Sequence, residues 1–328
     1  MSLLNYKQFR NPVVRLVCSY LFDWVLCFFL IGLFFLLDRV EPFHREFSVQ
    51  NIDIMFPFKE ETVPLWALGL ICTVFPILVI ALVALGARRS PYDLHNGLLG
   101  LLVSVLLTTI FTQVIKVTVG KHRPDFLSRC QPAENGIPIT HDLPLKLWPI
   151  SVCAQTDKDI LKDGMRSFPS GHASTSFAGL FYLSLWLAGK MHVFDRRGYS
   201  FKGVIIIAPI LAAMLVAISR VEDYRHSAFD VTWGSIIGIV FAIFAYHQYY
   251  PSLLNLRSHV PHPPRDFSYL VTDSHGNTNE ATQLENVTGI RPNHDLVDET
   301  RSEQQPRTLN SFDTNNGYSK SEDPLQRV

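Results

Sequence analysis

The sequence predicts an all-α protein that crosses a lipid bilayer six times. Hydrophobic residues make up 48% of the 328 residues and charged residues only 18%, and the charges fall mostly between long apolar runs. A spanning helix needs roughly 17 to 25 mostly apolar residues, and the runs approach or exceed this length. The 29 basic and 29 acidic side chains balance, so net charge does not indicate nucleic acid as a partner.

Six apolar runs are the expected spanning helices. They cover residues 16–37, 64–86, about 94–115, 172–189, 203–219 and 231 to about 249. The first run is too long for the apolar region of a signal peptide and has no cleavage pattern, so it should remain a helix. It contains Asp23, an intramembrane charge for which a packing or assembly role and a functional role both remain open.

Positive charge in the short connections orients the helices. Lys and Arg gather before the first run, between the second and third, and between the fourth and fifth, at Lys7, Arg10, Arg15, Arg88, Arg89, Lys190, Arg196, Arg197 and Lys202. These segments should be cytosolic. Connection 38–63 holds more acidic than basic side chains and should lie on the opposite side. Connection 116–166 must lie there too although it is rich in Lys and Arg, an exception that an anion-binding site would explain.

The runs divide the chain into three parts. Residues 1–15 form a short basic cytosolic segment, and residues 16–250 form the six-helix domain, whose core at about 94–250 holds the polar clusters. Residues 251–328 are polar and lack any sustained periodicity, which predicts a disordered cytosolic tail. The sequon Asn286-Val287-Thr288 lies in this tail, where a cytosolic location leaves it without glycan.

The five cysteines fall into two groups. Cys18, Cys27 and Cys72 lie within apolar runs, where a thiol behaves as a small apolar group. Cys130 and Cys153 both lie between the third and fourth runs. On a non-cytosolic face they can pair, and the disulfide would stabilise this connection by roughly 3 kcal/mol. Two free thiols are the alternative.

Three polar clusters interrupt the apolar part of the chain, at residues 116–124, 166–172 and 219–230. The first ends the third run, the second opens the fourth, and the third joins the fifth to the sixth. Odd-numbered spans end on the side where even-numbered spans begin. The six-span topology therefore brings all three clusters to the non-cytosolic face.

These clusters carry the groups that bind a phosphate. The planar fork of arginine matches phosphate oxygens, and the first turn of a helix presents backbone N–H groups that lack intrahelical partners. Pro169, Ser170 and Gly171 open the fourth run in this way. The expected phosphate-binding residues are Lys116, Arg123, Ser170, Gly171 and Arg220, with Arg166 as a further candidate.

Two histidines remain for catalysis. His226 and Asp230 are four residues apart at a helix start, so the carboxylate can orient the imidazole, which makes His226 the expected nucleophile. His172 has no carboxylate at helical spacing and is the expected proton donor to the leaving group. Taken singly, the motifs also fit a structural pair, a surface cation or a stop-transfer charge. Their coincidence on one face favours the catalytic interpretation.

The three clusters resemble the three-part signature of the type 2 phosphatidic acid phosphatase family, through Lys116-x6-Arg123-Pro124, Pro169-Ser170-Gly171-His172 and Ser219-Arg220-x5-His226-x3-Asp230. This family shares its helical core with vanadium haloperoxidases and glucose-6-phosphatase. The surrounding residues, with Cys130 and Cys153, are similar to fungal and plant lipid phosphate phosphatases of the diacylglycerol pyrophosphate phosphatase type. The resemblance implies a phosphohistidine on His226 supported by Asp230, protonation by His172, and no need for a divalent metal or other cofactor.

The expected function is hydrolysis of phosphomonoester or pyrophosphate head groups of lipids in the bilayer at its non-cytosolic face. Diacylglycerol pyrophosphate and phosphatidate are the favoured substrates, and lysophosphatidate is a further one. The expected location is an endomembrane (vacuole, ER or Golgi) with a lumenal site, or the plasma membrane with an external site. Nothing in the sequence indicates an oligomeric state.

Several alternatives stay open. A polyprenyl or dolichyl diphosphatase and a sphingoid-base phosphatase would share every motif. Six spans argue against a haloperoxidase, which is normally soluble, and a glucose-6-phosphatase usually has more spans. The non-enzymatic alternative is a silent scaffold or transporter of the same fold.

Overall fold

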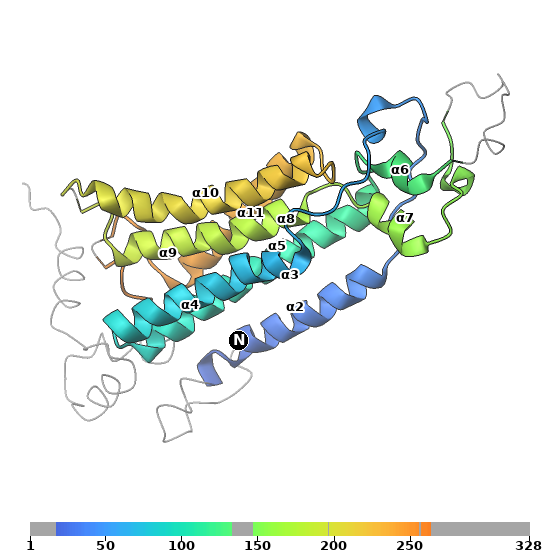
Figure 1. Cartoon of the computed structure of the whole chain (residues 1–328). Helices are drawn as coiled ribbons and strands as arrows, with labels where there is room; N and C mark the ends of the chain where they lie inside the picture. The colour runs from blue at the N-terminus through green and yellow to red at the C-terminus, as the bar shows by residue number, and fades with distance from the viewer. Residues whose placement is uncertain (1–17, 133–146, 196, 256, 264–328) are drawn as a thin grey trace, which may run out of the picture.

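The computed structural model describes residues 18–132, 147–195, 197–255 and 257–263. No strand occurs among these residues, and their β-type pairings are isolated bridges from Phe47 to Trp148 and from Pro132 to Cys153. The long helices lie side by side as a bundle, and the short helices α6 (Phe126–Cys130) and α7 (Lys158–Gly164) sit beyond one end of it (Figure 1). The all-α prediction is confirmed.

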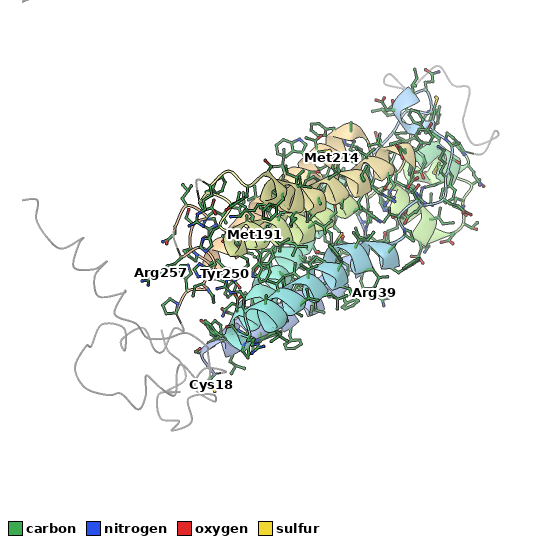
Figure 2. The ribbon with its side chains drawn as sticks, turned by 60° about the vertical axis from the view of Figure 1, so that its left-hand side comes forward. Cys18, Arg39, Met191, Met214, Tyr250 and Arg257 are labelled. Carbon is green, nitrogen blue, oxygen red and sulfur yellow. A yellow bond between two sulfur atoms is a disulfide. The ribbon has the colours of Figure 1, made fainter. Side chains whose placement is uncertain are left out.

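Four of the predicted spans are single helices. They are α2 (Leu21–Arg39), α5 (Pro91–Val119), α10 (Ser200–Glu222) and α11 (Ala228–Tyr249). Cys18 and Arg39 mark the two ends of the bundle along α2, and Tyr250 and Arg257 lie toward the Cys18 end (Figure 2). We call this the far end, because the three polar clusters lie at the other one.

The second and fourth spans are helices interrupted by π-helical turns. The second consists of α3 (Leu65–Gly69), α4 (Phe75–Ala81) and π turns at Leu70–Val74 and Leu82–Ala87. The fourth consists of α8 (Gly171–Ser176), a π turn at Phe177–Phe181 and α9 (Tyr182–Lys190). The two spans touch at their π turns, because a Cβ on Gly179 would lie 1.9 Å from the carbonyl oxygen of Cys72. Only glycine permits this approach.

Within the described residues, five helical stretches are long and apolar enough to cross a membrane, and the fourth predicted span is not among them. Its first turns carry polar side chains such as His172, Ser174 and Thr175, so it is less apolar than the other five. Its helical segments follow one another without a break from Gly171 to Lys190, and a helix of this length reaches about 30 Å. The structure is therefore consistent with six spans. Large apolar side chains such as Phe28 and Phe35 point outward from the bundle, as expected of an integral membrane protein.

Glycines in α11 bring it against the start of α8. A Cβ on Gly234 would lie 2.6 Å from the carbonyl oxygen of Ser170, and one on Gly238 would lie 2.3 Å from that of Ser174. The backbone N–H of Ser170 also donates to the carbonyl of Asp230 at 3.0 Å. The second and third polar clusters are thus joined backbone to backbone.

The end of α5 places the first cluster. Gly120 ends the helix in the left-handed conformation, with φ 57°, and its N–H donates to the carbonyl of Lys116. A Cβ on Gly120 would lie 1.8 Å from the carbonyl oxygen of Phe43 in the connection after α2. This close turn carries the chain from Lys116 on α5 into the segment that holds Arg123.

The far end of the bundle is closed by polar contacts. Asp93 pairs with Lys190, whose ammonium also donates to the carbonyl of His259, and Tyr92 donates to the carbonyl of His262. The first part of the predicted tail, up to residue 263, therefore packs on the helices. The rest of that tail, with Asn286, lies outside the described residues, as does the whole of the predicted segment 1–15.

Candidate active site

The three polar clusters meet at one end of the bundle, where α5 ends, α8 begins and α10 turns into α11 (Figure 1). Lys116 on α5 lies within electrostatic range of Arg123 and Arg220. The same three cations act on His226. Side chains from all three clusters therefore lie close to His226, as the six-span topology predicted.

The imidazole of His226 has a fixed tautomer. Its Nδ1 lies 2.7 Å from the carbonyl oxygen of Ser167. A carbonyl only accepts hydrogen bonds, so Nδ1 carries the proton and Nε2 keeps its lone pair. Burial, with the charges of Arg123, Lys116 and Arg220, holds the pKa of His226 well below its ordinary value of 6.5. The ring is therefore neutral at physiological pH, as a nucleophile must be.

Asp230 does not orient His226 directly, which differs from our expectation. Its carboxylate accepts hydrogen bonds from the Ser167 hydroxyl at 2.6 Å, the Lys121 ammonium at 2.7 Å and the Ser227 backbone N–H at 3.2 Å. Between the described atoms of Asp230 and His226 there is no hydrogen bond. The carboxylate thus acts on the imidazole through Ser167. The four-residue spacing could not reveal this intermediate, because Ser167 belongs to another segment.

His172 lies in the first turn of α8. Its Nε2 is 3.0 Å from the carbonyl oxygen of Val63, so this nitrogen carries a proton in the neutral ring. In the charged ring Nδ1 carries a second proton, which it can give to a leaving group, and in the neutral ring it can take a proton back. Arg220, Glu61 and Lys116 all lie within electrostatic range of the ring.

We call the expected phosphate-binding residues, Lys116, Arg123, Ser170, Gly171 and Arg220, the cradle. Its two arginines are buried and have hydrogen-bond donors without a partner. Arg123 is 6% exposed and Arg220 is fully buried. Among the described residues, the Nε atoms of both lack any hydrogen-bond partner. The Nε atoms of Arg129, Arg166 and Arg225 are unpaired as well, so this feature alone does not mark the phosphate site, but each of these two donors is free to take an acceptor. An oxyanion between them would supply it.

Ser170 contributes differently from the expectation, whereas the backbone N–H of Gly171 stays a predicted phosphate donor. The backbone N–H of Ser170 is already bonded to the carbonyl of Asp230, so it cannot serve a phosphate. The Ser170 hydroxyl accepts from the N–H of Ala173 and keeps its own proton to donate. Lys116 lies beside Gly171, with its Nζ 3.6 Å from where a Cβ would be. The missing side chain at Gly171 leaves this ammonium accessible.

Arg166 is not part of the cradle, so the suggestion that it binds phosphate was wrong. Its guanidinium lies 2.9 Å from the Asp38 carboxylate and donates to the carbonyls of Asp38 and Val40. It therefore ties the second cluster to the end of α2. Only its backbone reaches the site, where its carbonyl accepts from Lys116 Nζ at 3.1 Å.

Two carboxylates that the sequence did not reveal hold the cradle arginines. Asp163 on α7 lies 2.6 Å from Arg123, and Glu61, in the connection before α3, lies 3.1 Å from Arg220. Burial raises the pKa of Asp163, but Arg123 and the neighbouring cations outweigh it, and the carboxyl pKa stays below its ordinary value. Neither carboxylate stands at a regular spacing from any motif.

The connection that carries Asp163 is closed by a disulfide between Cys130 and Cys153, the paired alternative of the two that the sequence allowed. Cys130 ends α6, and its neighbour Arg129 lies 2.9 Å from the Asp163 carboxylate. The disulfide therefore fixes the helix that supports Asp163.

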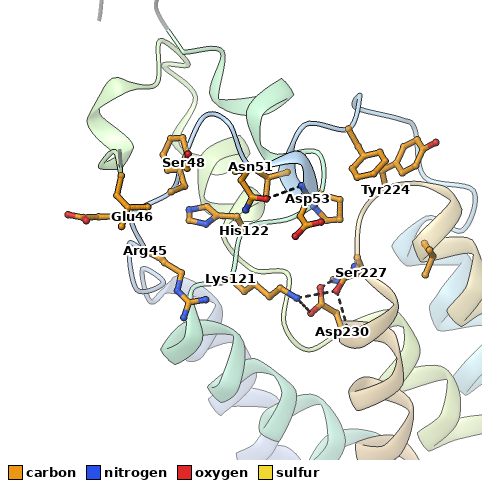
Figure 3. A pocket seen from close by; sticks show the side chains of 17 residues that line it. Arg45, Glu46, Ser48, Asn51, Asp53, Lys121, His122, Tyr224, Ser227 and Asp230 are labelled. Carbon is orange, nitrogen blue, oxygen red and sulfur yellow. Dashed lines mark hydrogen bonds and ion pairs between the residues drawn. The ribbon is translucent and has the colours of Figure 1, made fainter. Parts of the chain in front are cut away.

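A cavity of about 740 Å³ adjoins the site, and Figure 3 shows Lys121 within it, pointing at Ser227 and Asp230. His226 also lines this cavity, while His172 does not. The other wall comes from the connection after α2, including Arg45 and Phe47. The cavity thus gives access to the His226 side of the cradle from outside the helix bundle.

Comparison with known proteins gives the family. Residues 97–253 match the PAP2 superfamily. The chain is 43% identical to lipid phosphate phosphatase 2 of Arabidopsis thaliana over 76% of this chain and 83% of that protein. It is 40% identical to the probable diacylglycerol pyrophosphate phosphatase 1 of Schizosaccharomyces pombe, over 65% and 74% respectively.

A further relative is diacylglycerol pyrophosphate phosphatase 1 of Saccharomyces cerevisiae, 33% identical over 75% of this chain and 82% of that protein. No solved structure matched the chain. The resemblance seen in the three motifs is confirmed by these matches, and the protein belongs to the PAP2 superfamily.

Proposed function

We propose that this protein is a metal-independent lipid phosphate phosphatase that works through a phosphohistidine on His226. Its family and its named relatives make it a lipid phosphate phosphatase. The observation that carries the mechanism is the hydrogen bond from His226 Nδ1 to Ser167, which leaves Nε2 with a lone pair among three cations. Cationic and hydroxyl donors bind the phosphate without a metal, namely Lys116, Arg123, Ser170 and Arg220, and His172 supplies the proton.

In the first step, His226 Nε2 attacks the phosphorus of the substrate in line with the leaving oxygen. The N–P bond forms, the P–O bond breaks, and the electron pair stays on the leaving oxygen. His172 donates the Nδ1 proton to that oxygen, which releases the dephosphorylated lipid. Lys116, Arg123 and Arg220 stabilise the charge on the remaining phosphoryl oxygens.

In the second step, a water molecule attacks the phosphorus from the side that the lipid has left. His172, now neutral at Nδ1, accepts a proton from this water. The new P–O bond forms, the N–P bond breaks, and the electron pair returns to Nε2 of His226. Inorganic phosphate leaves, and the enzyme returns to its starting state.

The favoured substrates are diacylglycerol pyrophosphate and phosphatidate, with lysophosphatidate as a further one. Two of the relatives carry diacylglycerol pyrophosphate phosphatase in their names. The site lies at the ends of spanning helices, where a lipid head group can enter while its acyl chains stay in the bilayer. The excess of Lys and Arg in the other connections supports a lumenal or external site, in an endomembrane or the plasma membrane.

A panel of lipid phosphates tests this function. Purified protein in detergent is given diacylglycerol pyrophosphate, phosphatidate, lysophosphatidate, a sphingoid phosphate and a polyprenyl diphosphate, each with EDTA, and phosphate release is measured. We expect the first two to react fastest, with full activity in EDTA and inhibition by vanadate. Release that depends on added Mg²⁺ would contradict the mechanism. Faster turnover of the polyprenyl or sphingoid substrate would make that lipid class the preferred substrate. No phosphate release from any lipid would favour the catalytically silent scaffold.

A further inference from the structure

Arg225 is outside the three motifs, yet it is as buried as the cradle, at 6% exposed. It directly precedes His226 in a tight turn after α10. The backbone N–H groups of both residues donate to the carbonyl of Arg220 at 3.1 Å, and Tyr224 before them has a φ of 56°. This turn sends the His226 ring toward Ser167 and the cradle, and the Arg225 side chain away from it.

Arg225 lies between the two carboxylates that hold the cradle arginines. Its Nε is 3.8 Å from Oε1 of Glu61, the same oxygen that pairs with Arg220 at 3.1 Å. Its Nη1 is 3.8 Å from Oδ2 of Asp163, whose other oxygen pairs with Arg123 at 2.6 Å, and also 3.8 Å from Oδ2 of the buried Asp125. An unbroken chain of ion pairs therefore joins Arg220 to Arg123 through Arg225.

The guanidinium of Arg225 is held in place on its other sides. It lies over the ring of Phe58, with its Cζ 4.6 Å from the ring centroid, and Arg129 lies 5.2 Å from that centroid. Its Nη2 donates to the carbonyl of Lys59 at 3.2 Å. A planar guanidinium can address two carboxylates and stack on a ring at once, whereas an ammonium is a point charge.

Electrostatics explains why this position requires a cation. Without Arg225, Glu61 and Asp163 each lose one neighbouring cation that offsets their negative charge. Each carboxylate then pulls more strongly on its own cradle arginine and away from a bound phosphate. A mobile cradle loses the preorganisation that anion binding requires.

We propose that Arg225 is a positioning residue for phosphate binding: by bridging Glu61 and Asp163 it fixes the separation of Arg220 and Arg123. This inference rests on the proposed function, because it assigns the two arginines to a phosphate. Arg225 itself touches neither the substrate nor the reacting atoms.

The test measures phosphate affinity apart from turnover. In R225Q we expect KM for phosphatidate and the inhibition constants of inorganic phosphate and orthovanadate to rise about tenfold, as for one weakened charge-assisted contact. We expect kcat to change much less. R225K keeps the charge without the fork and should restore only part of the affinity, and it serves as the test variant if R225Q does not accumulate as folded protein.

Double variants test whether Arg225 acts on phosphate binding through Glu61 and Asp163. E61Q and D163N should each raise the inhibition constant of vanadate, and combining either with R225Q should add little to the larger single effect. K190Q, which removes a buried cation paired with Asp93 at the far end, controls for a general loss of stability. It should lower the melting temperature without changing vanadate inhibition.

Wild-type inhibition constants in both R225Q and R225K would overturn the proposal, as would full additivity with E61Q and D163N. Neither result touches the proposed function, since the wild-type protein would still release phosphate in the same assay. Absence of turnover in the wild-type protein would instead refute the proposed function.

Discussion

The carbonyl oxygen of Ser167 lies 2.7 Å from Nδ1 of His226, and this bond decides which nitrogen can attack phosphorus. The hydroxyl of the same serine lies 2.6 Å from the Asp230 carboxylate. Ser167 therefore links the carboxylate of the third motif to its histidine. Loss of the hydroxyl should therefore lower catalysis, although Ser167 is not one of the residues that bind the phosphate.

S167A removes the hydroxyl and keeps the carbonyl. We expect kcat to fall about 10- to 100-fold, because a hydrogen bond to a charged group contributes roughly 1.5 to 3 kcal/mol and here it holds the loop that orients His226. KM for phosphatidate should change less than kcat. S184A removes another buried hydroxyl, which donates to the carbonyl of Leu180 in α9, and should leave kcat unchanged. Unchanged kcat in S167A would show that Asp230 does not act through this serine.

Acid should destabilise the fold through His122. Burial, with the charge of Arg45, lowers the pKa of His122 from 6.5 to about 4. Between these values the unfolded chain binds a proton that the folded chain does not, so stability falls as the pH falls from 6.5 toward 4. The contribution of one such histidine approaches roughly 3 kcal/mol at the lower limit.

Thermal unfolding in detergent between pH 7 and pH 4.5 measures this effect. H122L should show a flatter dependence of the melting temperature on pH than the wild-type protein. H44L replaces an exposed histidine of the nearby connection and should keep the wild-type dependence. Identical curves for H122L and the wild type would exclude His122 as the acid-sensitive group.

Reduction should weaken phosphate binding as well as stability. The Cys130–Cys153 disulfide holds α6, whose Arg129 pairs with Asp163, which in turn pairs with Arg123. In the C130S/C153S double variant we expect a loss of roughly 3 kcal/mol in the stability of this connection and a higher KM. C18S, which removes a free thiol at the far end, is the control. A wild-type KM in the double variant would show that the disulfide does not affect phosphate binding.

The contact of α8 with α11 should tolerate no side chain. G234A places a Cβ 2.6 Å from the carbonyl oxygen of Ser170, so α11 must move away from the motif that holds His172. We expect lower activity and a lower melting temperature. G203A, where nothing lies within 4 Å, should be neutral or stabilising by up to about 1 kcal/mol, as expected for Ala over Gly in a helix. Equal behaviour of the two variants would contradict the packing described here.

The motifs and their convergence could be predicted because they depend only on spacing and on the direction of successive spans. Lys116, Arg123, His172, Arg220 and His226 meet for that reason. The direct contact predicted between Asp230 and His226 was wrong, because helical spacing places two side chains on one face but does not reveal a third group between them. Arg166 was misjudged because its partner, Asp38, stands 128 residues away.

The supporting carboxylates were beyond the reach of sequence reasoning. Glu61 lies in an irregular connection, and Asp163 lies on α7, whose seven residues are too few to show a periodicity from which the direction of a side chain could be read. The π-helical turn in the fourth span was equally hidden, since its apolar pattern is the same as that of an α-helix. These features arise from tertiary contacts, such as the approach of Gly179 to Cys72.

Trapping of the phosphoenzyme tests the central claim most directly. The protein is mixed with phosphatidate labelled with ³²P, quenched within one turnover, and assayed for protein-bound label that survives alkali and is lost in acid. Wild-type protein should carry such label on a peptide containing His226, and H226N should carry none and have no activity. Full turnover by H226N, or the same label in H226N, would contradict the account.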